Sequence, residues 1–245
     1  MSTSTTGVQE DAAADPRPHP LDNPVRAALA GPHAHFAERR GDILRYPADM
    51  SPFIGVPDAP AARDWADIAA LVGPGGLASY SAVDVPPPAG WELVMRGTGV
   101  QMTGEDVAAL PDEEAIRLTA ADVPEMLALV RLTEPGPFLP RTIEFGGYLG
   151  IRRGGRLVAM AGRRLRPPGW TEISAVCTHP DHRGQGLAAR LVSAVAAGVR
   201  AHGETPFLHA AASNTNAIRL YERLGFRLRR TTIFQAARVP GDVTG

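Results

Sequence analysis

A short segment rich in glycine carries the clearest chemical signal in the sequence. It has the pattern R-x-x-G-x-A and consists of Arg183, Gly184, Gln185, Gly186, Leu187 and Ala188. The first N–H groups of a helix have no partner inside the helix and carry partial positive charge, so they can bind a pyrophosphate. Glycines let such amides approach the phosphates, and Arg183 can add a charge-assisted contact. The segment therefore predicts a diphosphate-binding turn.

Side chains that could bind a metal are few near this turn. Cys177 is the only cysteine, so the chain can form neither an internal disulfide nor a site of several thiolates. His179 and His182 have a metal-like spacing, but no further ligands cluster with them in the sequence. We interpret Cys177 as a small buried hydrophobe and expect no metal site.

The turn stands between a predicted strand and a predicted helix. Trp170–Thr178 follows a Pro-Pro-Gly turn and is rich in residues typical of strands. After the turn, apolar residues recur at every fourth position, at Leu187, Leu191, Val195 and Val199. This spacing places them on one face of a helix that ends at His202-Gly203.

The remaining elements of the C-terminal half follow from local patterns of the same kind. They are a strand Ile116–Leu118, a helix from Asp122 to Glu134, a short helix Thr142–Phe145, strands Tyr148–Arg152, Arg156–Leu165 and Phe207–Ala211, a helix capped by Asn216 that stops at Gly225, and a last strand Phe226–Phe234. The predicted order is β-α-α-β-β-β-α-β-α-β.

The N-terminal half gives weaker signals. Residues 1–22 are small, polar and rich in proline, and we expect a disordered tail. Residues 23–112 are predicted to form a smaller α/β domain, and its pattern could be that of a degenerate copy of the second domain, which spans residues 113–245. Its expected elements are a short helix after Pro24, strands Pro52–Ile54, Ile43–Tyr46, Leu77–Ser81 and Trp91–Met95, a helix Ala61–Leu71 and a connector Met102–Glu114.

Charge and hydropathy exclude several classes of partner. The formal net charge is −1, which offers no electrostatic reason to expect a nucleic-acid partner or an anionic membrane. No apolar run approaches the roughly 18 residues needed to span a bilayer, and the N-terminus has no apolar export region. We therefore expect a cytoplasmic protein without nucleic-acid or membrane partners.

These motifs together resemble the GNAT superfamily of N-acetyltransferases. The resemblance covers residues 172–226 and includes the glycine turn, the strand order before it and the pattern from Asn216 through Tyr221 to Gly225-Phe226. The stretch PFLHAAASNTNAIRLYERLGF is similar to the glycine N-acyltransferase-like branch. The resemblance implies a mixed α+β fold, of the broad α/β class, with a mostly antiparallel central sheet and one splayed parallel strand pair.

The resemblance also implies a set of residues that bind acetyl-CoA. Pantetheine would lie between the splayed strands along the backbone of Val176, Cys177 and Thr178, with an N–H of Val176 or Cys177 near the thioester oxygen. The backbone from Arg183 to Ala188 would hold the pyrophosphate. Asn216 would contact the CoA arm.

Two side chains fit the chemistry of acyl transfer to an amine. An alkylammonium is not nucleophilic, so a base, or a water that it polarises, must take its proton before the thioester is attacked. Glu172, on the strand that leads to the acyl site, is the candidate base. Tyr221 is the candidate donor to the departing thiolate. Direct attack within a ternary complex requires no covalent enzyme intermediate.

Each of these residues also has a purely structural interpretation. Glu172 could be an arginine partner, Tyr221 could only pack in its helix, and Asn214 or Asn216 could only cap it. His209 could serve as a reserve base, although a packed, hydrogen-bonded histidine is the more common situation. The glycine turn could be an ordinary entry to a helix.

Two other functions compete with the acyltransferase. The residues Gly184, Gly186 and Ala189 also satisfy the dinucleotide fingerprint of a nicotinamide-dependent oxidoreductase, but Glu204 precedes the strand at whose end the fingerprint requires an acid. A non-catalytic acyl-CoA sensor would keep the fold without turnover. Measured affinities for NADH and acetyl-CoA, and thiol release with amines, separate these alternatives.

The acceptor is the least determined part of the prediction. A small-molecule or peptide amine fits the chemistry, and residues 134–141 with Glu144 and Tyr148 are expected to line its side of the site. We expect the N-terminal half to wall this cleft or to support a homodimer. The sequence does not distinguish acetyl from longer acyl donors.

Overall fold

The computed structural model describes residues 18–241. The tail expected over residues 1–22 therefore lies outside the described residues as far as residue 17. Residues 18–22 are packed against the rest of the chain, because Leu21 is fully buried and Asp22 pairs with Arg229 at 2.7 Å. An apolar side chain and an acid among the expected tail residues thus belong to the fold.

A single eight-stranded sheet forms the centre of the molecule, in the order β4-β11-β5-β10-β9-β8-β7-β6. Its strands are β4 (Leu77–Ser81), β5 (Glu92–Thr103), β6 (Ile116–Arg117), β7 (Leu149–Arg153), β8 (Arg156–Arg163), β9 (Trp170–Thr178), β10 (Thr205–Ala211) and β11 (Arg227–Arg238). The pair β9–β10 is parallel and the other neighbouring pairs are antiparallel. The predicted fold class is confirmed.

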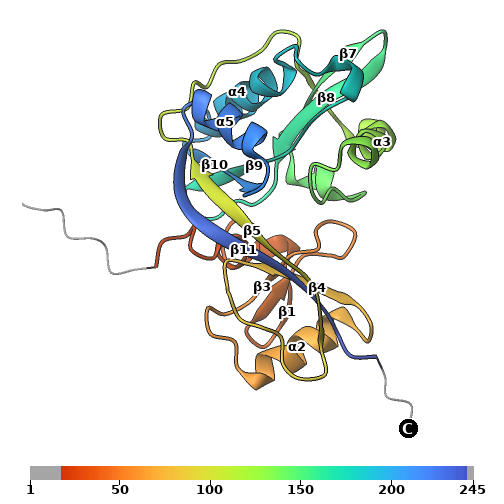
Figure 1. The fold of residues 1–245 in the computed structure, drawn as a ribbon, viewed down its shortest axis with the longest axis vertical. Coiled ribbons are helices and arrows are strands. Elements are labelled where there is room, and N and C mark those ends of the chain that lie inside the picture. Colours follow the sequence, from red (N-terminus) through yellow and green to blue (C-terminus); the bar gives the residue numbers. More distant parts are fainter. Residues whose placement is uncertain (1–17, 242–245) are drawn as a thin grey trace, which may run out of the picture.

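Helices cover both faces of the C-terminal part of this sheet (Figure 1). On one face, α4 (Leu187–Arg200) and α5 (Thr215–Arg223) share a core with the strands, and the predicted stripe of α4 is buried. On the other face lies α3 (Val123–Thr133). The short helix expected at Thr142–Phe145 is a 3-10 turn, η3. The predicted order of elements in this half is confirmed.

The N-terminal residues form a second lobe at the lower end of the view in Figure 1. It contains a small sheet of β1 (Glu38–Arg40), β2 (Ile43–Arg45) and β3 (Ile54–Gly55), with the helices α1 (Pro24–Leu29), η1 (Ala34–Phe36) and α2 (Ala62–Val72). The strands β4 and β5 also precede residue 112, yet they belong to the large sheet. The sheet thus crosses the boundary expected at residues 112/113, and β5 extends into the expected connector.

The N-terminal lobe packs directly against the large sheet. Its apolar cluster, which includes Leu21 and Tyr46, also contains Phe207 of β10 and Leu165, which follows β8. The two long strands β5 and β11 run between the lobes in Figure 1. The packed strands and the shared core position the N-terminal lobe over one end of the parallel pair.

His33 is a buried histidine in this interface and predicts a pH dependence of stability. Its side chain contacts the Tyr46 hydroxyl at 2.9 Å and stacks on Phe145 at 5.2 Å. Burial, and then repulsion from His35 and Arg166, lower the pKa of His33 to about 4. Since the unfolded pKa is near 6.5, the unfolded chain binds the extra proton as the pH falls.

We expect this stabilisation to be complete above pH 6.5 and to be lost as the pH falls towards 4. The loss between pH 7 and pH 5 should be about 2 kcal/mol. Urea unfolding of wild type and of His33→Gln at both pH values measures it, and the variant should show a flatter pH dependence. Equal pH dependence in the two proteins would assign the effect to other groups.

Candidate functional site

The parallel strands β9 and β10 diverge midway along their length. Their pairing runs from Trp170 with Thr205 to Ile173 with Leu208 and stops there. Beyond this point, β9 continues to Thr178 and β10 to Ala211 without further pairing between them. The main-chain groups on the two facing edges are therefore not bonded to each other. The splayed pair that the resemblance implied is present.

A bulge in β9 gives the physical cause of this divergence. Met160 of β8 pairs with Cys177 and Gly162 pairs with Ser174, so two residues of β9 lie opposite one of β8. One of the two, Ala175, has a φ of 53°, a left-handed conformation that is unfavourable for alanine. A bulge bends its strand, and this one turns β9 away at the point where its pairing with β10 ends. Sequence reasoning missed Ala175, since an alanine has no turn preference that would reveal it.

The three residues expected along pantetheine lie on β9 beyond or within this bulge. Val176 packs against the cluster under α4 and α5, whereas Cys177 belongs to the cluster under α3. Burial raises the pKa of the Cys177 thiol to about 11, so it stays protonated near neutral pH, in line with its interpretation as a small hydrophobe. The Thr178 hydroxyl is buried without a hydrogen-bond partner among the described residues.

The glycine turn has the geometry of an anion-binding loop. Gly184 and Gly186 have φ values of 77° and 73°, and the first hydrogen bond into α4 runs from the Arg190 N–H to the Gly186 carbonyl at 3.1 Å. Among the described residues, the main-chain N–H groups from Gly184 to Ala189 donate to no main-chain acceptor outside regular elements and to no cap side chain. This segment is open to solvent from Arg183 to Gly186. Unpaired amides thus gather at the positive end of a 14-residue helix.

The glycines of this turn meet a conformational requirement besides the expected close approach to phosphates. Within the described part of the chain, an added Cβ at Gly184 or Gly186 would meet nothing within 4 Å. The positive φ is the constraint that the protein itself imposes, since other residues rarely adopt it. The empty space next to these positions is also where a bound diphosphate would have room.

The residues expected from α5 occupy separate environments. Asn214 accepts a hydrogen bond from the Ala217 N–H at 3.1 Å and is the N-cap. The cap predicted at Asn216 is therefore wrong, because Asn216 lies in the first turn, where its side chain is exposed. Tyr221 is buried and packs near Phe226, and burial raises its pKa to about 12. Its phenol remains protonated and can act as a donor.

The Glu172 side chain is buried and hydrogen-bonded to two neighbouring side chains. It is fully buried, it accepts two hydrogen bonds of 2.8 Å from Arg164, and it contacts the His209 Nδ1 at 2.7 Å. Burial alone would raise the pKa of Glu172, but the charge and hydrogen bonds of Arg164 and the bond from His209 outweigh it, so the pKa lies well below its usual range. A carboxylate so paired is a poor proton acceptor. The geometry favours the arginine partner over the base.

His209 belongs to the same buried chain of polar side chains. Its Nε2 lies 3.1 Å from the Gln101 amide nitrogen, and the Gln101 oxygen accepts from Arg229 at 2.9 Å. Arg229 in turn pairs with Asp22. With Gln101 donating to Nε2, the His209 Nδ1–H donates to Glu172. Both ring nitrogens are therefore engaged, so His209 is the packed, hydrogen-bonded histidine and not a free base.

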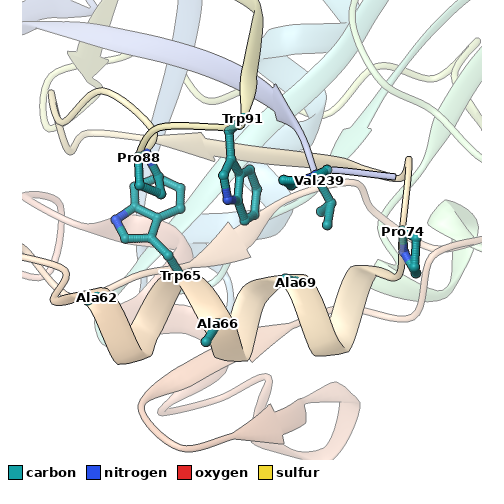
Figure 2. A pocket seen from close by; sticks show the side chains of 9 residues that line it. Ala62, Trp65, Ala66, Ala69, Pro74, Pro88, Trp91 and Val239 are labelled. Carbon is teal, nitrogen blue, oxygen red and sulfur yellow. The ribbon is translucent and has the colours of Figure 1, made fainter. Parts of the chain in front are cut away.

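Two surface hollows have no residue of the glycine turn in their lining. The larger, about 440 Å³, lies between α2 and the segments near Trp91 and Val239, with Trp65 and Trp91 on its wall (Figure 2). A second, about 220 Å³, is lined by residues of α3 and β8 together with His179.

In the described part of the chain, no three His, Cys, Asp or Glu side chains gather in a way that could hold a metal ion. None of the described helices has the length and apolar character to cross a bilayer.

Comparison with known proteins agrees with this geometry. The family model of FR47-like proteins matches residues 148–235. A crystal structure from Novosphingobium aromaticivorans, described as an acetyltransferase of the GNAT family, is 41% identical, covers 90% of this chain and 98% of that one, and superposes with a TM-score of 0.83. The chain therefore belongs to the GNAT family.

A more distant structure shows the fold alone. The GCN5-related N-acetyltransferase from Kribbella flavida is 20% identical, covers 90% of this chain and 97% of that one, and has a TM-score of 0.55. No curated protein matches the chain in sequence. The similarity to the glycine N-acyltransferase-like branch stays a prediction.

Proposed function

We propose that this protein is an N-acetyltransferase that transfers the acetyl group of acetyl-CoA to a primary amine. The observation that carries the proposal is the set of main-chain N–H groups from Gly184 to Ala189, which lack a partner within residues 18–241 and lie at the start of α4 beside two diverging strands. Such amides can donate hydrogen bonds to a diphosphate. The separated strand edges can form hydrogen bonds with an extended group that contains amides, such as pantetheine. Membership of the GNAT family supports the same donor.

The residues present fit such a donor along its length. In the proposal, the backbone of Arg183 to Ala188 holds the diphosphate, and Val176, Cys177 and Thr178 lie along pantetheine. The buried Thr178 hydroxyl, which lacks a partner among the described residues, is suited to bond it. Asn216 is exposed at the start of α5, as a contact to the CoA arm requires.

Acetyl-CoA supplies the acetyl group as a reactive thioester. A carbon–nitrogen bond to the amine forms and the carbon–sulfur bond breaks, with the sulfur leaving with the bonding pair. Tyr221, protonated near neutral pH, donates a hydrogen bond to this sulfur. A main-chain N–H of Val176 or Cys177 donates to the thioester oxygen as negative charge develops there.

The nitrogen also loses a proton, and in this proposal solvent water takes it. Glu172 is enclosed by Arg164 and His209, so we assign it the part of a positioning residue that joins β9, β10 and the segment following β8 at the point of divergence. The reaction then proceeds only with amines that bind in their neutral form. Its rate with a simple alkylamine should rise with pH.

The N-terminal lobe and the loop before η3 together form the acceptor side in this proposal. The Arg141 N–H donates to the Asp49 carbonyl at 3.0 Å, and the Thr142 hydroxyl donates to the Met50 carbonyl at 2.7 Å. These bonds attach the loop expected to line the acceptor to the N-terminal lobe. A small-molecule or peptide amine is the acceptor class that we propose.

Calorimetry with acetyl-CoA, followed by a library of amines monitored by free thiol and product mass, tests the proposal. Binding with turnover is the expected result. The chain has no lysine, so its side chains offer no amine that would produce background acetylation. Binding without turnover across the library would favour a non-catalytic sensor, and a folded protein that ignores acetyl-CoA would end the proposal.

Tyr221→Phe tests the part of the phenol. We expect kcat to fall about 100-fold while the KM for acetyl-CoA stays within a small factor, because the hydroxyl acts on the departing sulfur and not on binding. Steady-state thiol release measures both constants. An unchanged kcat would assign Tyr221 to packing alone.

A further inference from the structure

The Tyr148 hydroxyl is a buried polar group that no described residue satisfies. Tyr148 is 1% exposed, and its hydroxyl has no hydrogen-bond partner in the described part of the chain. Two other buried tyrosines, Tyr46 and Tyr80, are satisfied, since the Tyr46 hydroxyl contacts His33 and the Tyr80 hydroxyl donates to the Val85 carbonyl. An unpaired buried hydroxyl is unfavourable, so it calls for a partner that the protein itself does not supply.

The position of the ring shows where that partner would lie. Tyr148 directly precedes β7, and its ring covers Gly162 of β8, where an added Cβ would lie within 2.5 Å of three ring atoms. Gly162 pairs with Ser174 on β9, next to the bulged Ala175. The ring therefore extends across β8 towards the bulge, the place where β9 leaves β10.

The packing of the Tyr148 side chain points to the same location. Tyr148 shares its apolar cluster with Ala175 and Cys177, the residues on either side of Val176. Burial raises the pKa of Tyr148, with smaller and opposing effects from Arg164 and Glu172, so the phenol stays protonated. Arg164 donates from Nε and Nη2 to Glu172, and in the described part of the chain it forms no hydrogen bond with the Tyr148 hydroxyl. A neutral donor thus belongs to the cluster that contains the bulged Ala175.

We propose that the Tyr148 hydroxyl donates a hydrogen bond to the thioester carbonyl oxygen of bound acyl-CoA. This inference rests on the proposed function and names a second donor to the oxygen that a main-chain N–H of β9 also contacts. The phenol keeps its proton throughout, so no bond to the tyrosine forms or breaks. Its contribution grows as negative charge develops on that oxygen.

The test compares acetyl-CoA with CoA, which lacks the acetyl carbonyl, and requires no known acceptor. Calorimetric titrations of wild type, Tyr148→Phe and Tyr80→Phe give the ratio of the two dissociation constants. We expect wild type to prefer acetyl-CoA and the preference to shrink about fivefold in Tyr148→Phe, the effect of one hydrogen bond. Tyr80→Phe, in a buried tyrosine of the N-terminal half, should keep the wild-type ratio.

Thermal unfolding of the ligand-free proteins provides a second readout. Removing an unsatisfied hydroxyl should leave the Tm of Tyr148→Phe unchanged or higher, whereas Tyr80→Phe loses its 3.1 Å bond to Val85 and should melt earlier. An equal ligand ratio in wild type and Tyr148→Phe, or a drop in Tm like that of Tyr80→Phe, would overturn the inference. Failure of wild type to bind either ligand would overturn the proposed function itself, and this inference with it.

Discussion

Glu172→Gln is expected to lower the free energy of unfolding by about 3–5 kcal/mol. The substitution leaves the Arg164 guanidinium, whose side chain is 10% exposed, without its compensating charge and with a neutral amide in place of a bidentate carboxylate. It also weakens the bond to His209 that joins β9 to β10. Urea denaturation at pH 7, with the slope checked for two-state behaviour, measures the loss.

Glu144→Gln is the matched control for this experiment. Glu144 also accepts two hydrogen bonds from one arginine, Arg141, at 2.7 and 2.9 Å. Both side chains are 40% exposed, so solvent screens the pair and its loss should cost less than about 1 kcal/mol. Similar losses in the two variants would show that burial of Glu172 does not determine its contribution.

The pH dependence of the same pair has a definite sign. The folded pKa of Glu172 is depressed, so its stabilisation is fully present above the unfolded pKa near 4.5 and is lost as the pH falls below that value. Wild type should therefore lose stability in acid faster than Glu172→Gln below pH 4.5. This window lies below most of the range in which His33 acts, so the two residues can be separated.

Gly186→Ala is expected to weaken acetyl-CoA binding about 100-fold. Alanine disfavours the φ of 73° at this position, so the turn must rotate, and at least one or two charge-assisted bonds from the converging amides are lost. Each such bond contributes about 1.5–3 kcal/mol, and about 2.7 kcal/mol corresponds to the expected loss of affinity. Calorimetric titration with acetyl-CoA measures it.

Gly203→Ala separates the loss of binding from the loss of stability. Gly203 also has a φ of 73° and no atoms within 4 Å of an added Cβ, but it follows the opposite end of α4. Both variants should lose about 1–2 kcal/mol of stability from backbone strain, while Gly203→Ala should keep the wild-type affinity. If Gly186→Ala also binds acetyl-CoA normally, the amides of this turn do not hold the diphosphate.

Local interactions explain why much of the C-terminal half was predictable. The four-residue spacing from Leu187 to Val199 specifies a helix face without reference to any other segment, and the glycine turn before it depends on neighbouring backbone groups alone. The strands Trp170–Thr178 and Phe207–Ala211 were recognisable for the same reason. The position of the cap at Asn214, two residues from the expected Asn216, shows the limit of such signals at helix ends.

Other features depended on contacts between distant segments. The placement of β5 between β11 and β10 joins residues from both halves of the chain, and no local pattern specifies a strand's neighbours. The pairing of Glu172 with Arg164 and His209 requires that β9, β10 and the segment following β8 meet, and it changes the interpretation of Glu172 from a base to a buried ion-pair partner.

The sequence by itself determined the family resemblance, the glycine turn and the order of elements, because each depends on residues close along the chain. Only the tertiary structure decided how the bulge at Ala175 separates β9 from β10, which side chains are left unpaired beside it, and that Glu172 is enclosed. Proton affinity and unsatisfied hydrogen bonds depend on burial and on partners, and a chain acquires both only when remote segments pack together.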